Sequence, residues 1–177
     1  AVQSDSLKKI NPATDTSLQL AIEAQKRGYK IFWYEPNNLS IVNSKLKAQG
    51  SLVIFYNTQK NFYKISKNIK FDISKAAFTL IRQNPPFNMN YINSTYFLDS
   101  IDHKKVINNP SAIRNVSEKF YSSKFLKFMP PTIFTNSIID IYKHYKKYKK
   151  IVLKPLDGYA GKNIIFLTKN FSKSKVS

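Results

Sequence analysis

The sequence predicts an α/β fold built on an open, mostly parallel sheet, and three observations support that prediction. Residues 1–3 have the pattern of the end of a strand, and they are followed by an amphipathic helix and by the pattern of a buried strand at residues 29–35. A strand, a helix and a strand in this order form the unit that usually opens a parallel sheet. A third predicted strand, residues 76–82, stops before two consecutive prolines, which forbid continued strand pairing.

The first helix is predicted by its cap, its apolar face and its stop signal. Asp15, Thr16 and Ser17 are suited to cap a helix N-terminus, and Gly28 is suited to end the helix. The helix face between them carries Leu18, Ala21, Ile22 and Gln25. The polar loop of residues 4–14 would then emerge at the carboxyl end of the first strand, where open α/β sheets bind ligands.

The middle of the chain has the pattern of a β insertion followed by helical turns. Residues 38–73 contain several short β-like runs and little helical periodicity, so we expect a small meander or hairpin there. Beyond the strand at residues 76–82, we expect a helix over 89–104, a short strand at 105–108 and helical turns over 110–125.

The last third of the chain contains a boundary signal and a second amphipathic helix. Residues 129–131, Met-Pro-Pro, are the candidate for a domain boundary that composition suggests. Residues 138–150 have helical spacing with lysines facing outward. The predicted inward stripe consists of Ile138, Ile141, Tyr142, Tyr145 and Tyr148.

A strand, a glycine turn and a second strand over residues 151–167 predict an anion site. Side chains alternate along a strand, so Lys154 shares a face with Val152, and an ammonium group on a buried face is costly unless an anion meets it. Gly158 and Gly161 allow backbone N–H groups to approach an anion closely. We therefore predict a clamp for nucleotide phosphates, although the glycine spacing differs from that of a P-loop.

Two further positions are suited to bind an anion, and the residues leave both readings open. Arg82, just before Asn84-Pro85-Pro86, is either an ordinary edge cation or an anion-binding group, and its place at the end of a strand favours the ligand. Asp15-Thr16-Ser17 caps a helix, and the N-terminus of that helix is also an anion site. His103 and His144 lack partners at metal-ligand spacing, so we predict no metal site within the chain.

Composition excludes some functions and leaves one alternative. A formal net charge of +19 suggests a basic nucleic-acid-binding module, which is the alternative function, or an anionic membrane as partner. Only three of the 29 basic residues are arginines, however, and the lysines lie among many Asn, Ile, Tyr and Phe residues, a mixture that an A+T-rich gene encodes. With 42% hydrophobic residues the 177-residue chain can bury a core. We therefore expect no nucleic-acid and no membrane partner.

The same reasoning gives an expected location. The chain contains no cysteine, which excludes disulfides and thiolate nucleophiles within it. The first residues lack the charged and apolar regions of a signal peptide, and no apolar run approaches the roughly 20 residues of a spanning helix. We expect a cytoplasmic location.

Four segments along residues 1–169 match the motifs of one family in order. They are the polar loop leading to Asp15-Thr16-Ser17 and Glu23-Ala24-Gln25-Lys26-Arg27-Gly28-Tyr29, then Arg82-Gln83-Asn84-Pro85-Pro86-Phe87, then Asn109-Pro110 through Arg114-Asn115 and Glu118-Lys119, and then Leu153 to Gly158, which reads L-K-P-L-D-G. In these segments the chain resembles the bacterial glutathione synthetases, members of the ATP-grasp superfamily. The resemblance implies a Rossmann-like pre-ATP-grasp domain at residues 1–118, followed by the beginning of an ATP-grasp domain at residues 119–177.

The resemblance also implies an activity. Enzymes of this family use ATP and Mg²⁺, or Mn²⁺ in its place, to join γ-glutamylcysteine to glycine through an acyl phosphate, and we expect a homo-oligomer at full length. Another ATP-grasp carboxylate–amine ligase is the nearest alternative. No Asp or Glu follows Asp157, so the metal ligands that lie late in ATP-grasp chains are absent. We expect about the first half of such an enzyme, inactive alone and without catalytic residues of its own.

The site residues implied by the resemblance fall into two groups. The ATP-binding residues are Lys119, Lys154, Gly158, Tyr159, Ala160 and Gly161, the last four forming a mobile glycine-rich flap. The peptide-substrate residues are Asp5, Asp15, Thr16, Ser17 and Arg82. The family usually has glycine in place of Ala160 and methionine in place of Tyr159, which brings the flexibility of the flap into question.

Overall fold

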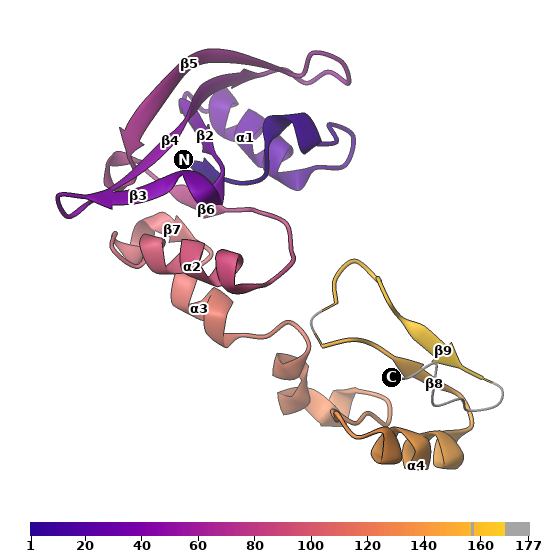
Figure 1. Cartoon of the computed structure of the whole chain (residues 1–177). Coiled ribbons are helices and arrows are strands. Elements are labelled where there is room, and N and C mark those ends of the chain that lie inside the picture. Colours follow the sequence, from indigo (N-terminus) through magenta and orange to yellow (C-terminus); the bar gives the residue numbers. More distant parts are fainter. Residues whose placement is uncertain (157, 169–177) are drawn as a thin grey trace. The chain divides into compact units, whose positions relative to one another are not determined.

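The computed structural model describes residues 1–156 and 158–168, and the chain divides into two compact units, Ala1–Asn115 and Val116–Ser177 (Figure 1). The Met129-Pro130-Pro131 boundary suggested by composition is therefore wrong, because these residues lie inside the second unit. The rings of Phe120 and Phe134, on either side of the prolines, stack with centroids 5.5 Å apart and hold this segment together. The boundary between residues 118 and 119 stays a prediction.

Four parallel strands form the centre of the first unit. β1 (Val2–Gln3) lies between β2 (Ile31–Tyr34) and β6 (Thr79–Ile81), and β7 (Val106–Ile107) pairs with β6. The pairings are all parallel, and the order is β2-β1-β6-β7. The α/β class expected from the sequence is confirmed.

An antiparallel meander extends the same sheet beyond β2. It consists of β3 (Leu39–Val42), β4 (Lys45–Phe55) and β5 (Tyr63–Asp72), and the long strand β4 pairs with β3, β5 and β2. The predicted meander is therefore confirmed, and it is joined to the main sheet through β4 rather than standing apart from it. Short 3₁₀ turns connect the strands at Leu7–Lys9, Pro36–Asn38, Ile73–Lys75 and His103–Lys105.

Helix α1 (Thr16–Lys26) forms as its signals predict. The Asp15 carboxylate accepts a hydrogen bond from the Leu18 N–H at 2.8 Å, and Gly28 adopts a φ of +87° just beyond the helix. The Gln25 side chain exchanges two hydrogen bonds of 2.9 Å with the backbone of Phe55. These bonds fasten α1 to β4, so Gln25 serves as a polar anchor on an otherwise apolar face.

Helix α2 (Met89–Leu98) is shorter than the predicted span of residues 89–104. The chain turns after Leu98, and the Asp102 carboxylate then caps a separate 3₁₀ turn by accepting from the Lys104 N–H at 3.0 Å. Helix α3 (Pro110–Asn115) follows β7 and packs against α2. Arg114 joins the two helices: it donates to the Asp99 carboxylate at 2.5 Å and to the Thr95 hydroxyl at 3.0 Å.

The sheet separates two apolar clusters, one on each face, and alternation along β2 decides which side chain enters which cluster. Ile31 and Trp33 join the cluster that includes the buried face of α1, whereas Phe32 and Tyr34 join the cluster that includes Leu98 of α2. All four β2 side chains are buried, as expected of a strand covered on both faces. Figure 1 shows α1 and α2 beside this sheet.

Tyr34 is predicted to limit stability at alkaline pH. Its side chain is 1% exposed, its hydroxyl has no hydrogen-bond partner among the described residues, and burial raises the pKa of the phenol. Above pH 10 the unfolded chain loses this proton while the folded chain keeps it, so the free energy of unfolding falls by up to about 1.4 kcal/mol per pH unit. Because the hydroxyl is buried without a partner, Tyr34→Phe should raise stability at pH 7 by about 1 kcal/mol.

Urea denaturation at pH 7 and pH 11 measures both effects. Tyr34→Phe should lose less stability between these pH values than the parent chain does. Tyr29→Phe, which alters a tyrosine that is 48% exposed, is the matched control and should follow the parent. A Tyr34→Phe variant that is less stable than the parent at pH 7 would show that the hydroxyl is bonded in solution.

The second unit contains short helices and a two-stranded sheet. A 3₁₀ segment, Phe120–Phe128, and helix α4 (Ile138–Tyr148) precede β8 (Ile151–Leu153) and β9 (Ile165–Leu167), which pair antiparallel. The predicted helix and strands are confirmed. Two members of the predicted inward stripe are not inward: Tyr142 is 40% exposed and Tyr148 is 38% exposed. No helix within residues 1–156 and 158–168 is long and apolar enough to cross a membrane.

Candidate functional site

The connections of the parallel strands predict a crevice between the carboxyl ends of β1 and β6. The chain leaves β1 through α1 towards β2, whereas it leaves β6 through α2 towards β7 on the opposite side. Where neighbouring connections of a parallel sheet run in opposite directions, the sheet opens a crevice that commonly binds ligands. Asp5 follows β1 and Arg82 follows β6, so both lie at this point.

Four residues predicted to contact the peptide substrate come together there. The Arg82 guanidinium donates to the Thr16 hydroxyl at 2.6 Å and to the Ser17 hydroxyl at 3.2 Å. The Asp5 carboxylate accepts from the Asn84 backbone N–H at 3.0 Å, which ties the β1 loop to the segment that carries Arg82. Both chain segments that follow β1 and β6 thus contribute to one polar cluster at the N-terminus of α1.

Asp15, the fifth predicted residue, has a structural contact of its own. Its carboxylate caps α1 through the Leu18 N–H, which confirms the capping interpretation of this residue. Thr16 and Ser17, the first two residues of the helix, turn their hydroxyls to Arg82 instead. Of these three consecutive residues, Asp15 therefore caps the helix, and Thr16 and Ser17 contact Arg82.

The loop that carries Asp5 is held in place by hydrogen bonds with β2. The Trp33 indole N–H donates to the Asp5 carbonyl at 2.9 Å, and the Ser4 N–H donates to the Tyr34 carbonyl at 3.1 Å. Trp33 is 3% exposed, so its bond to the loop is protected from water. The backbone of Asp5 is consequently held by the buried core of the sheet.

The charge at this crevice is suited to an anion. Among the described residues Arg82 makes no salt bridge, and its two side-chain hydrogen-bond partners are neutral hydroxyls. A guanidinium without a carboxylate partner retains its charge for a ligand, and its planar fork matches a carboxylate or phosphate. The nearby Asp5 carboxylate supplies the complementary charge for a cationic group.

Tyr91 belongs to this crevice, although sequence reasoning did not single it out. Burial raises the pKa of the Tyr91 phenol; the Arg82 charge acts to lower it and the Asp5 charge to raise it, so the ring lies within electrostatic reach of both. Its ring packs against Phe87 with centroids 5.1 Å apart. The sequence offered one sign of this role: Tyr91 lies in the first turn of the helix that follows Asn84-Pro85-Pro86-Phe87.

In the second unit, the Lys119 side chain contacts the predicted glycine flap through a hydrogen bond. The Lys119 ammonium donates to the Gly158 carbonyl, and its side chain is 20% exposed. The backbone N–H groups of Tyr159, Ala160 and Gly161 make no hydrogen bond to any residue that the structure describes. Lys119 and loop N–H groups that bond to no described residue can together bind an anion.

Lys154 lies on the same strand–loop segment, but the predicted burial of its face is wrong. Lys154 is exposed, Val152 on the same face is 47% exposed, and Phe166, the cross-strand neighbour of Val152, is 69% exposed. The reason is that β8 and β9 form a sheet of two strands, and no described element of this unit covers that face. The cost of burying an ammonium group therefore gives no argument for an anion at Lys154. Asp157, in the L-K-P-L-D-G motif, lies outside the described residues.

The departure from the family pattern at Ala160 has a structural cost. Ala160 adopts a φ of +49°, next to Gly161 at +73°, so an alanine occupies a left-handed conformation that glycine adopts without strain. Lys162 lies over the Tyr159 ring, 4.6 Å from its centroid, and its ammonium is 3.1 Å from the Tyr159 hydroxyl. These contacts link Tyr159 to Lys162 across the turn.

We predict that Ala160→Gly relieves this strain. The substitution removes a left-handed alanine but adds chain entropy to the unfolded state, so the expected net gain in the free energy of unfolding is about 0.5 kcal/mol. Chemical denaturation followed by circular dichroism measures the change. The reciprocal control, Gly161→Ala, should lower stability by a similar amount, because a Cβ there meets no neighbour and only the backbone is strained. Equal stabilities of both variants and the parent would contradict the left-handed turn.

The described residues do not form a metal site. No cluster of three His, Asp or Glu residues that could hold a metal ion occurs in the part of the chain that the structure describes. Mg²⁺ prefers several oxygen ligands, with carboxylates prominent among them. We therefore assign no Mg²⁺ ligand to the residues that the structure describes.

Comparison with protein-family models identifies the class of protein to which the chain belongs. Residues 118–176 match the family model described as "Prokaryotic glutathione synthetase, ATP-grasp domain", and residues 1–114 match "Prokaryotic glutathione synthetase, N-terminal domain". The chain therefore combines a pre-ATP-grasp α/β domain with the opening of an ATP-grasp domain. It belongs to the prokaryotic glutathione synthetase family.

Curated relatives agree with this membership. The chain is 35% identical over 168 residues to the glutathione synthetase of Mesorhizobium japonicum, covering 94% of this chain and 54% of the relative. It is 39% identical over 150 residues to that of Anaplasma centrale, covering 85% of this chain and 47% of the relative. The glutathione synthetase of Buchnera aphidicola subsp. Acyrthosiphon pisum is 36% identical over 169 residues. The chain thus spans about half the length of these curated relatives.

Proposed function

We propose that this chain is the N-terminal portion of a glutathione synthetase, which ligates γ-glutamylcysteine to glycine at the expense of ATP. The observation that supports the proposal most directly is the cluster of Asp5, Thr16, Ser17 and Arg82 at the crevice between β1 and β6. The family membership of both units supports the same activity. Because the chain spans about half of its relatives, it is proposed to be inactive alone.

The first unit is proposed to bind the peptide substrate. γ-Glutamylcysteine carries two carboxylates and one ammonium group, and the crevice offers a guanidinium and a carboxylate. Arg82 would bind a substrate carboxylate, while the Thr16 and Ser17 hydroxyls hold the guanidinium in one orientation. Asp5 would accept the substrate ammonium group, and Asp15 is assigned to the helix that presents the site.

The second unit is proposed to bind ATP. Lys119 and Lys154 would contact the phosphates as point charges, and the backbone N–H groups of residues 159–161 would close over them. In the reaction a substrate carboxylate oxygen attacks the γ-phosphorus and ADP leaves; the glycine nitrogen then attacks the acyl carbon, and inorganic phosphate and a proton leave. A closed loop keeps water from the acyl phosphate. Mg²⁺, or Mn²⁺ in its place, belongs to the proposed reaction, but this chain's described residues are given no part in holding it.

A chimera tests the proposal. The N-terminal 168 residues of this chain replace the corresponding half of the Mesorhizobium japonicum relative, and glutathione formation is measured with ATP, Mg²⁺, γ-glutamylcysteine and glycine. Product that depends on all four components is expected. A folded chimera that makes no glutathione would contradict the proposal, and product with another amine in preference to glycine would favour a different carboxylate–amine ligase.

Two finer expectations are part of the same proposal. The full-length enzyme is proposed to be a cytoplasmic homo-oligomer that acts on small molecules. Size-exclusion chromatography of the active chimera measures the oligomeric state. A monomer with full activity would contradict that part of the proposal and leave the activity unaffected.

A further inference from the structure

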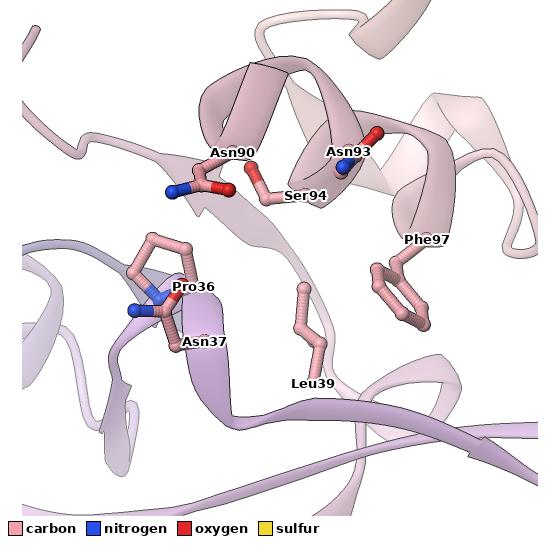
Figure 2. A pocket seen from close by; sticks show the side chains of 7 residues that line it. All are labelled: Pro36, Asn37, Leu39, Asn90, Asn93, Ser94 and Phe97. Atoms are coloured by element: carbon pink, nitrogen blue, oxygen red, sulfur yellow. The ribbon is translucent and has the colours of Figure 1, made fainter. Parts of the chain in front are cut away.

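The first unit contains a pocket that none of the assigned site residues lines. Its volume is about 280 Å³, and it lies between one face of α2 and the segment from Pro36 to Leu39, which leads from β2 into β3 (Figure 2). The α2 wall consists of Asn90, Asn93, Ser94 and Phe97, at the spacing of one helix face. The volume of the pocket is close to the lower end of the size range of small-molecule sites.

The walls of this pocket are uncharged, although the chain carries a formal charge of +19. Every lining residue is an asparagine, a serine or an apolar residue. Phosphate and carboxylate ligands are generally met by Lys, Arg or a helix N-terminus. The lining therefore selects for an uncharged ligand.

Three side-chain amides at the rim are free to bind such a ligand. Asn37, Asn90 and Asn93 are exposed, and their amides make no hydrogen bond to any residue within 1–156 and 158–168. Figure 2 shows Asn90 on the α2 wall and Asn37 on the opposite wall. Each carboxamide offers a donor beside an acceptor, which pairs with an acceptor and a donor side by side on a flat ring.

The floor is apolar and held in place by a buried network. Leu39 is 9% exposed, and Phe97 is partly buried beside it. The Ser94 hydroxyl accepts from the Gln83 amide at 2.8 Å and from the Gln3 amide at 3.3 Å, and it donates to the Tyr91 carbonyl at 2.7 Å. Its hydrogen-bonding capacity is used within the protein, so it fixes α2 to the sheet and leaves recognition to the rim amides.

We propose that this pocket binds an uncharged flat ligand with an adjacent donor and acceptor on one edge, the class to which purine bases belong. The ring face would lie against Pro36, Leu39 and Phe97, and its edge would pair with a rim amide. The proposal is independent of the ligase activity, because it uses none of the residues assigned to the peptide substrate or to ATP.

Titration of adenosine into the ¹⁵N-labelled 177-residue chain tests the proposal by NMR. The side-chain amide signals of Asn37, Asn90 and Asn93 should shift together with one saturating dependence on concentration. Ribose 5-phosphate, an anion without a base, should leave them unchanged. Asn90→Leu and Asn93→Leu, which keep a similar side-chain volume, should each weaken adenosine binding by about tenfold or more, the effect of losing one good polar pair.

A matched variant separates this site from other adenosine sites. Asn57→Leu changes an exposed asparagine of the β4–β5 turn, outside the pocket, and should bind as the parent does. Unchanged binding in both pocket variants, signals that shift only around residues 158–163, or no binding up to millimolar adenosine would each overturn the proposal.

Discussion

Gly50→Ala should destabilise the first unit by about 3 kcal/mol, the largest stability effect that we expect from adding a single methyl group to this chain. A Cβ at position 50 would lie 2.5 Å from the Trp33 carbonyl oxygen, 2.7 Å from Cζ of Phe32 and 2.8 Å from Cβ of Tyr34. All three contacts are with β2, which is buried on both faces and cannot move aside. Gly50 is therefore required by the close approach of β4 to β2, and not by a turn.

Denaturation with guanidinium chloride, followed by the fluorescence of Trp33, measures this effect. Trp33 is the only tryptophan of the sequence, and it lies beside the site of the expected clash. Gln49→Ala, at the exposed neighbouring position of the same strand, is the control and should change stability by less than about 0.5 kcal/mol. If Gly50→Ala were as stable as Gln49→Ala, the pairing of β4 with β2 would be wrong.

The contrast between Gly50 and Gly28 shows which parts of this fold the sequence predicts. Gly28 follows an amphipathic run and ends a helix through its own φ, so its role is visible from its neighbours along the chain. The role of Gly50 arises from a strand 16 or more residues away, and its neighbours along the chain give no sign of it. Local signals thus predicted α1, the meander and the strands, whereas the attachment of the meander to the main sheet needed the structure.

The residues of the candidate site also divide into those that local sequence signals predict and those that they do not. Arg82 was predictable because it ends an apolar strand before two prolines, and such strand ends gather at one edge of a parallel sheet. The Lys154 face was mispredicted because alternation shows which residues share a face but not whether that face is covered. Tyr91 was missed because its relation to Asp5 and Arg82 comes from the packing of α2, which no local pattern encodes.

Arg82→Gln is expected to lower kcat/KM for γ-glutamylcysteine in the chimera by about a hundredfold, with the KM for ATP unchanged. The variant keeps a hydrogen-bonding side chain but removes the positive charge, and a charge-assisted hydrogen bond contributes about 1.5–3 kcal/mol. A hundredfold change corresponds to about 2.8 kcal/mol. Because Arg82 makes no salt bridge among the described residues, its removal leaves no carboxylate unpaired there, and the fold should tolerate it.

Two sets of variants distinguish binding by Arg82 from a general effect of charge. Arg27→Gln removes an equal charge from the exposed end of α1, where Arg27 pairs with Glu23 at 3.1 Å, and it should leave both kinetic constants within about twofold. Thr16→Val with Ser17→Ala removes the two hydroxyls that orient the guanidinium, so it should raise the KM for γ-glutamylcysteine by less than Arg82→Gln does. Equal losses in Arg82→Gln and Arg27→Gln would attribute the effect to the overall field of a strongly basic chain, and the crevice between β1 and β6 would then no longer be the peptide site.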